Sequence, residues 1–249
     1  MSGKANIAVL VSGGGTNLQA LIDAEQAGKL PSGKIALVVS DHAGAYALER
    51  AKGAGIPHIT LLRRELGGQS GFEAALQNEL EAHGIDLVIL AGFLSILSGD
   101  FTARWPERIL NVHPSLIPSF CGKGYYGLRV HAAALARGVK VTGATVHFVN
   151  EIPDGGRILL QKAVEIMPGD TPETLQKRVM EQAEWLLLPQ AAETVSGAIM
   201  QEKGGGPHPS AASRETGGCH LPPKGKAKRK GDFPHPALRA TFPRGGRQI

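Results

Sequence analysis

The stretch NIAVLVSGGGTN, residues 6–17, sets the expectation for the fold. It begins with a continuous run of apolar residues, which is typical of a strand buried on both faces of a sheet. A loop with three glycines follows, and a helical pattern begins at about Thr16, with Leu18 and Leu21 on one face. A buried strand, a short loop and an amphipathic helix in this order predict the first unit of an α/β fold.

Strand-like and helix-like segments continue to alternate through the first half of the chain. Further strands are expected at residues 34–40, 58–62, 86–92 and 109–113. Helices are expected between them at residues 44–54 and 71–83. Short connections between alternating strands and helices predict a mostly parallel sheet covered by helices.

The pattern changes in the second half. A helix expected at residues 128–137 leads to two strand-like segments, VTGATVHFVN (141–150) and RILLQKAVEI (157–166). These two segments are close enough in sequence to pair as a hairpin-like unit, which predicts an antiparallel portion near the carboxyl end. A last amphipathic helix is expected over about residues 171–195.

Charge divides the chain into a body and a tail. Residues 201–249 hold ten Lys/Arg and three Asp/Glu, which leaves 17 basic and 19 acidic residues in 1–200. The net charge of +5 therefore belongs to the tail, and the body is nearly neutral. The tail is rich in Gly and Pro and lacks periodicity, so we expect one catalytic domain over 1–200 and a disordered tail over 201–249. Nucleic-acid binding through PPKGKAKRKGD is an alternative, but no aromatic residues interleave with the basic ones to support specific reading.

Several classes of protein and site do not fit the sequence. No apolar run reaches the roughly 18 residues that a membrane helix needs, and the amino end lacks the pattern of a signal peptide. The two cysteines, Cys121 and Cys219, are far apart and match no metal-ligand spacing. We therefore expect a cytoplasmic location, no membrane partner and no metal site.

The glycine loop SGGGTN (12–17) is a candidate anion site. It follows the first strand and opens a helix, where backbone N–H groups are unpaired and the helix dipole favours negative charge. Counting from Gly13, the third glycine position of a dinucleotide fingerprint is Leu18, and no Gly-Lys-Ser/Thr follows as in a Walker loop. A phosphate monoester fits such a loop better than a dinucleotide, and a plain tight turn is the alternative.

Three further groups suggest acyl-transfer chemistry. In ILNVHPSLIP, Asn111 and His113 share one face at the carboxyl end of a strand, the edge where open parallel sheets place their ligand crevices. Asp154 lies in the turn IPDGG, which alone indicates only an Asp-Gly turn. Acyl transfer without a covalent nucleophile needs an oxyanion stabiliser, a proton donor and a group that keeps the donor charged. An amide, an imidazole and a carboxylate beside an anion loop meet these needs.

Four segments, in this order and spacing, resemble the folate-dependent formyltransferase superfamily: SGGGTNLQAL, LAGFLSILS, ILNVHPSLIP and GATVHFVNEIPDGGRIL. The resemblance covers roughly residues 6–195, and the first segment points within the superfamily to the phosphoribosylglycinamide formyltransferases of purine biosynthesis. It implies a Rossmann-like formyltransferase fold. It also implies formyl transfer from 10-formyltetrahydrofolate, a co-substrate and no tightly bound cofactor, to the amine of glycinamide ribonucleotide. The expected partners are these small molecules, and the sequence leaves monomer and homodimer open.

The resemblance also implies roles for site residues. Asn111, His113 and Asp154 match the catalytic trio of the family. Asn111 would donate to the tetrahedral oxyanion, His113 as imidazolium would protonate the leaving folate nitrogen, and Asp154 would raise the pKa of His113. The expected contacts of glycinamide ribonucleotide are Gly15, Thr16, Asn17 and Glu184. The expected contacts of the folate are Phe93, Leu94, Ser95, Ile96, Leu97 and Asn111, with the exposed backbone of Leu94–Leu97 bonding the pteridine edge.

Some of these assignments have plainer alternatives. Glu184 would otherwise lie on a solvated helix face, and LAGFLSIL would otherwise be a core strand and loop. His131 and His147 sit in family-typical places, but satisfied structural histidines are expected at both.

Other positions depart from the family pattern. Residues 119–131 form a longer segment than in many relatives, either a mobile lid or a bulkier loop. An arginine often found near the folate tail is not evident around Gln69, although Arg63 is near.

Two related enzymes are the main alternatives. Formyltetrahydrofolate hydrolase uses a similar trio with water as acceptor, but that family carries a regulatory domain before the catalytic one, and here the first strand starts at residue 6. Methionyl-tRNA formyltransferase needs a further folded domain, for which 201–249 offers no core. A nucleic-acid-binding module that acts through the basic tail is the non-enzyme alternative.

Overall fold

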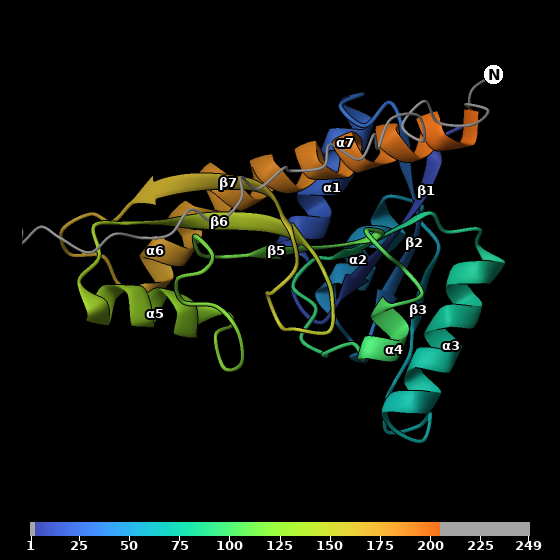
Figure 1. The fold of residues 1–249 in the computed structure, drawn as a ribbon, viewed down its shortest axis with the longest axis horizontal. Coiled ribbons are helices and arrows are strands. Elements are labelled where there is room, and N and C mark those ends of the chain that lie inside the picture. The colour runs from blue at the N-terminus through green and yellow to red at the C-terminus, as the bar shows by residue number, and fades with distance from the viewer. Residues whose placement is uncertain (1–2, 205–249) are drawn as a thin grey trace, which may run out of the picture. The chain divides into compact units, whose positions relative to one another are not determined.

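A seven-stranded sheet forms the centre of the protein in a computed structural model that describes residues 3–204 (Figure 1). The strand order is β3-β2-β1-β4-β5-β6-β7. The strands are β1 (Ala5–Val11), β2 (Gly33–Ser40), β3 (His58–Thr60), β4 (Leu87–Leu90), β5 (Ile109–His113), β6 (Val141–Phe148) and β7 (Ile158–Glu165). The first five run parallel, and β6 runs antiparallel to both β5 and β7. The predicted α/β class, with an antiparallel portion at its carboxyl end, is confirmed.

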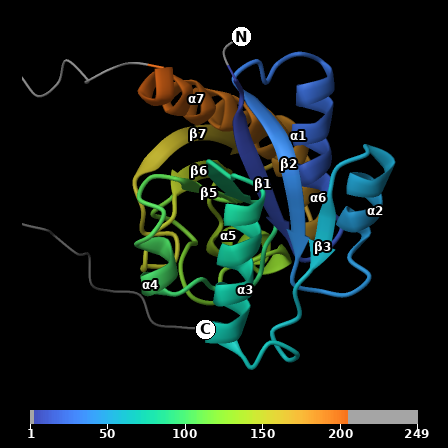
Figure 2. The same ribbon diagram turned by 90° about the vertical axis from the view of Figure 1, so that its right-hand side faces the viewer.

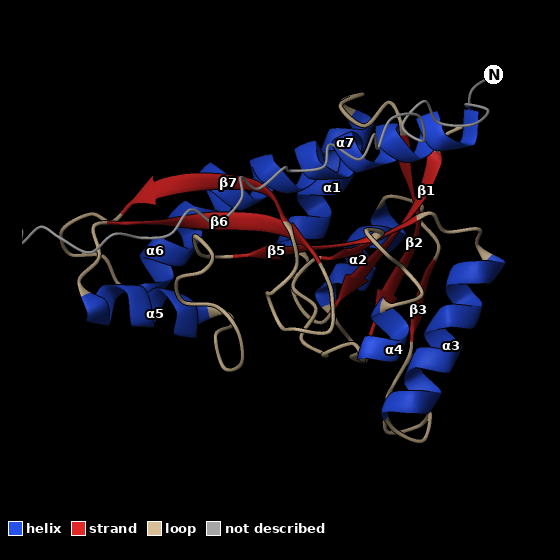
Figure 3. Cartoon of the chain, in the orientation of Figure 1, coloured by secondary structure: helices blue, strands red, loops and turns tan. Residues whose placement is uncertain are grey.

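Helices cover both faces of this sheet (Figures 2 and 3). They are α1 (Thr16–Gln26), α2 (Tyr46–Gly53), α3 (Gln69–Ala82), α4 (Gly99–Thr102), α5 (Leu128–Arg137), α6 (Pro172–Val179), the π-helix η1 (Met180–Glu184) and α7 (Trp185–Gly204). On one face Val9 of β1 packs in a cluster with Leu18 of α1 and Leu188 of α7. On the other face Leu10 packs in a cluster with Phe72 of α3. Successive residues of β1 thus enter different cores, which explains its uninterrupted apolar run.

Two helices differ from the prediction. The four-residue α4 was not expected, because a single turn carries too little periodicity to be read from sequence. The final helix, expected over 171–195, includes a π-helical turn and continues to Gly204, so residues 201–204 are helical and not part of a disordered tail. The rest of the predicted tail, residues 205–249, lies outside the described residues. Within residues 3–204, no helix is both long and apolar enough to span a membrane.

The loop between β1 and α1 is shaped by its contact with α2. Ala47 N donates to Gly13 O at 3.0 Å, and Arg50 Nε donates to Gly14 O at 2.8 Å. Gly15 has φ +70, and a Cβ added there would lie 2.6 Å from Ala47 Cβ. Both the backbone angle and the close approach of α2 therefore require glycine at position 15.

We expect Gly15→Ala to lower the free energy of unfolding by roughly 1–3 kcal/mol, because alanine is strained at this φ and overlaps Ala47. Gly14→Ala is the matched control, since a Cβ on Gly14 meets nothing within 4 Å. Urea denaturation of the two variants measures the difference. Equal losses in both would contradict the assigned packing.

Candidate active site

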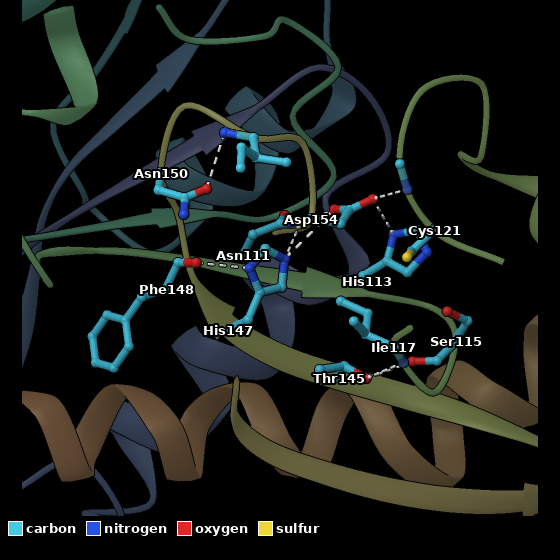
Figure 4. A network of polar contacts seen from close by, with 12 residues as sticks. Asn111, His113, Ser115, Ile117, Cys121, Thr145, His147, Phe148, Asn150 and Asp154 are labelled. Carbon is cyan, nitrogen blue, oxygen red and sulfur yellow. Dashed lines mark hydrogen bonds and ion pairs between the residues drawn. The ribbon is translucent and has the colours of Figure 1, made fainter. Parts of the chain in front are cut away.

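The end of β5 brings together the three groups named from the sequence (Figure 4). Asn111 Nδ2 lies 3.5 Å from Asp154 Oδ1, and His113 Nδ1 lies 3.5 Å from Asp154 Oδ2. Asn111 and His113 share a face of the strand because they are two residues apart. Asp154 reaches them from the turn between β6 and β7.

Backbone groups of the segment after β5 orient His113. Its Nε2 lies 2.9 Å from Phe120 O, so this nitrogen donates a hydrogen bond to the carbonyl. The other ring nitrogen, Nδ1, is then the one that faces Asp154. Phe120 has φ +50, a left-handed conformation that few non-glycine residues adopt, and this turn presents its carbonyl to the ring.

Asp154 is held in its charged form. Burial would raise the pKa of this carboxyl, but His147, His113 and a hydrogen bond from Gly122 N outweigh burial and lower the pKa. The Gly122 bond to Asp154 Oδ2 is 2.8 Å long. One carboxylate thus lies against a backbone N–H and two imidazole rings.

The expected rise in the pKa of His113 is not found. Burial, which leaves His113 only 4% exposed, lowers its pKa, whereas the charge of Asp154 and the Phe120 carbonyl raise it. Burial is the larger effect, and the net pKa lies below the usual value. Sequence reasoning identified the carboxylate but not the depth at which the imidazole is buried.

His147 is the buried and satisfied histidine that was expected, and it also belongs to this cluster. It lies directly across from Asn111 in the antiparallel register of β5 and β6. Its Nδ1 lies 2.8 Å from Phe148 O and donates there, which leaves Nε2 as an acceptor for Asn111 Nδ2 at 3.2 Å. The alternation of β6 was readable from sequence, but the register that pairs His147 with Asn111 was not.

His131 is not the satisfied histidine that was expected. It is 1% exposed, and among residues 3–204 neither of its ring nitrogens has a hydrogen-bond partner. Burial, with a smaller contribution from the charge of His113, lowers its pKa to about 4. His131 is therefore neutral at physiological pH.

Asn111, His113 and Asp154 line a cavity of about 940 Å³. The residues expected to contact either substrate all line it: Gly15, Thr16, Asn17, Phe93, Leu94, Ser95, Ile96, Leu97, Asn111 and Glu184. The glycine loop and the segment after β4 lie in one cavity with the polar cluster. Sequence reasoning missed other lining residues, including Gln176 and Met180, which only the packing of the last helices brings to the site.

Comparison with known proteins agrees with this arrangement. Residues 5–191 match the family model for formyl transferase. The chain belongs to the formyl transferase family. It is 46% identical over 176 residues to the phosphoribosylglycinamide formyltransferase of Haemophilus influenzae, a match that spans 71% of this chain and 80% of the relative.

Two further relatives define the extent of the likeness. The crystal structure of glycinamide ribonucleotide transformylase 1 from Symbiobacterium toebii superposes with a TM-score of 0.73 and 42% identity, covering 78% of this chain and 89% of that one. The chicken trifunctional purine biosynthetic protein adenosine-3 is 44% identical over 200 residues, which are 80% of this chain and 19% of the relative. This formyl transferase thus spans about a fifth of the trifunctional protein.

In this formyl transferase Glu184 is buried, so the alternative of a solvated helix face is wrong. It lies in the π-helix η1, where Asn17 Nδ2 donates to its carboxylate at 2.7 Å. Burial raises the pKa of Glu184 to about 7, although the Asn17 bond acts in the opposite direction. The glycine loop and the last helices are joined through this contact.

The segment after β4 presents apolar side chains to the cavity, but some of its backbone N–H and C=O groups are hydrogen-bonded within the protein. Leu94 and Ile96 are 60% and 61% exposed. Leu94 N donates to Ser12 Oγ at 2.8 Å, and Ile96 O accepts from Arg63 and Gln69 at 3.1 and 3.0 Å. Two backbone groups expected to bond the pteridine edge are thus already paired within the protein.

The long segment after β5 forms one rim of the cavity. The Phe120 and Tyr125 rings meet edge to face at 6.3 Å. Burial and the nearby Asp154 raise the pKa of the Cys121 thiol, so it is not an activated nucleophile. Whether the segment is a mobile lid or a bulkier loop stays a prediction. Among residues 3–204, no group of three or more His, Cys, Asp or Glu side chains is placed so that it could hold a metal ion.

The raised pKa of Glu184 predicts a pH-dependent effect on stability. The folded protein holds this proton more tightly than the unfolded chain, so its stabilising contribution is complete below the ordinary pKa of 4.5 and is lost as the pH rises through about 7. We expect Glu184→Gln to gain stability relative to wild type over this interval, by about 3 kcal/mol. Urea denaturation at several pH values measures the difference.

Glu181→Gln, at an exposed position of the same π-helix, is the matched control. If the difference between Glu184→Gln and wild type did not change with pH, Glu184 would not take up a proton on folding.

Proposed function

We propose that this formyl transferase moves the formyl group of 10-formyltetrahydrofolate to the amine of N1-(5-phospho-D-ribosyl)glycinamide. The products are formylglycinamide ribonucleotide and tetrahydrofolate, in de novo purine biosynthesis. The observation that carries the proposal is that Asn111, His113 and Asp154 lie in one cavity between a glycine loop and an apolar wall. The likeness to phosphoribosylglycinamide formyltransferases over most of the chain supports it.

The glycine loop suits the phosphate and glycinamide end of the nucleotide. Gly13, Gly14 and Gly15 precede the 11-residue helix α1, whose first N–H groups and dipole favour an anion. Thr16 and Asn17 begin this helix at the cavity wall, and Glu184 lies beside Asn17, where a carboxylate can accept from ribose hydroxyls.

The wall after β4 suits the pterin of the folate. Phe93, Leu94, Ile96 and Leu97 line the cavity, and the first three keep part of their surface open. A flat aromatic ring covers such apolar surface with a gain of about 25 cal/mol per Å² removed from water. Ser95 and the paired backbone groups then fix where the ring lies.

The reaction is a direct acyl transfer. The amine attacks the formyl carbon, a new C–N bond forms, and the carbonyl oxygen becomes an oxyanion. Asn111 Nδ2 carries two hydrogens, which face His147 Nε2 at 3.2 Å and Asp154 Oδ1 at 3.5 Å. The second contact is long and therefore weak, so this hydrogen turns to the oxyanion when it forms. The bond to the folate nitrogen then breaks, that nitrogen gains a proton, and the amine loses one.

His113 supplies the proton from Nδ1, because Nε2 is committed to Phe120 O. Burial disfavours the imidazolium that this step requires, and the nearby Asp154 carboxylate offsets part of that penalty. Asp154 also has the position to hold a water that passes the amine proton onward. Its role is therefore to permit a charged histidine in a buried place.

The remaining assignments complete the proposal. The folate acts as a co-substrate and not as a resident cofactor, and the partners are small molecules and not membrane or specific nucleic acid. The protein acts in the cytoplasm as a monomer or homodimer, its catalytic domain is 1–200 extended by the last turn of α7, and 205–249 takes no part in catalysis.

The activity is tested with 10-formyltetrahydrofolate in the presence and absence of glycinamide ribonucleotide. We expect loss of the formyl folate only when the amine is present, with formylglycinamide ribonucleotide formed in equal amount. Consumption that is independent of the amine would instead identify the hydrolase and overturn the proposal.

The roles of Asn111 and His113 predict large kinetic losses without unfolding. Asn111→Ala and His113→Ala are each expected to lower kcat by about 10²–10³, because each removes a group that acts on the transition state. Steady-state kinetics and circular dichroism measure rate and fold separately. Asn78→Ala and His58→Ala, which truncate the same residue types at exposed positions, are the controls. Near-normal kcat in either site variant would remove it from the mechanism.

A further inference from the structure

Another buried carboxylate, besides Asp154 and Glu184, lies near the cavity. Asp41 directly follows β2, and its side chain is 3% exposed. Its Oδ2 accepts from Ser95 Oγ at 2.6 Å, and its Oδ1 lies 2.6 Å from His42 Nδ1. His42 itself points outward, with 58% of its side chain exposed.

The charge on Asp41 is stabilised by these contacts. Burial raises the pKa of Asp41, but hydrogen bonds from Ser95, His42 and Ser12 outweigh burial and hold the pKa below its usual value. Hydrogen bonds to an ionised acceptor are about twice as strong as neutral ones. Ser95 is therefore held firmly by the end of β2.

Asp41 also acts on the residue before Ser95. The Ser12 side chain, which lies near enough to Asp41 to lower its pKa, accepts from Leu94 N at 2.8 Å. Leu94 and Ser95 are thus both fixed to the ends of β1 and β2, which lie next to each other in the sheet. The far side of the loop is held by other groups, since Ile96 O accepts from Arg63 and Gln69.

Because different groups hold the two sides of this loop, the loss of Asp41 would affect only one side. The loop beyond Ile96 keeps its own bonds, including those of Ser98 N and Oγ to Glu73 at 2.6 Å. Only the part that carries Leu94 would loosen. Leu94 is 60% exposed in the cavity wall, and an exposed apolar side chain binds a ligand best when its backbone is already fixed.

We propose that Asp41 is a positioning residue for the folate co-substrate, acting through Ser95 and Ser12 to fix the backbone on which Leu94 meets the pterin. This inference rests on the proposed function, because it takes the wall after β4 as the pterin site. Asp41 touches neither substrate, so its effect falls on folate affinity and not on the chemical step.

The variant Asp41→Ala tests the inference by the split between kinetic constants. We expect the KM for 10-formyltetrahydrofolate to rise roughly tenfold, the loss of one charge-assisted hydrogen bond. The KM for glycinamide ribonucleotide and kcat should change by no more than about twofold. Asp41→Asn keeps an acceptor for Ser95 and should restore most of the folate affinity.

His42→Ala is the matched control, because it removes a contact of the same carboxylate that faces away from the loop. It should leave the folate KM within about twofold of wild type. Ser95→Ala should reproduce the Asp41→Ala loss, and the double variant should lose less than the product of the two. If Asp41→Ala does not fold, Ser95→Ala with Asp41→Asn carries the same test.

Direct titration with tetrahydrofolate separates this inference from the proposed function, since it needs no turnover. Weaker binding by Asp41→Ala supports the positioning role even if the wild type transfers no formyl group to the nucleotide. Unchanged tetrahydrofolate affinity would overturn it, as would an equal rise in the KM of both substrates.

Discussion

The site depends on a single negative charge, the Asp154 carboxylate, placed where the sheet is mostly buried. Its side chain is 13% exposed, yet it faces His113 on one oxygen and His147 on the other. A buried carboxylate with these neighbours stays ionised, and an imidazolium beside it is less costly than it would be alone. Under the proposed function, Asp154 offsets part of the penalty that burial places on the charged form of His113.

The two ends of the cavity are held by different elements of the fold. The glycine loop is fixed by α2 through Gly15, and the wall after β4 is fixed by Asp41 and by Arg63. Asn111 and His113 stand between them on β5, the last parallel strand before the sheet turns antiparallel. Under the proposed function, a rigid sheet thereby sets the distance between the loop that binds the phosphate and the apolar wall that binds the folate, as bringing two substrates into reactive geometry requires.

Sequence reasoning reached the fold and the trio because both rest on local pattern. Apolar runs and helical periodicity predicted the succession of strands and helices along the chain. Side-chain alternation placed Asn111 and His113 on one face of their strand. The backbone groups that contact His113 and Asp154, the Phe120 carbonyl and the Gly122 N–H, could not be predicted. Phe120 adopts a left-handed conformation that its residue type does not signal. The contact of His147 with Asn111 was not predicted for a related reason, since only strand register brings the two residues together.

One buried atom without a hydrogen-bond partner lies where the glycine loop meets the last helices. Asn17 Oδ1 has no partner among residues 3–204, and beside it Glu184, which accepts from Asn17 Nδ2, is buried with a pKa raised to about 7. An unpaired buried oxygen costs stability in the free protein, typically about 1–3 kcal/mol. Under the proposed function, a ribose hydroxyl that donates to this oxygen removes that cost only when the substrate is bound. Pairing this oxygen on binding thus adds to the affinity for a polar nucleotide. An apolar molecule of the same size cannot pair it and gains no affinity from it.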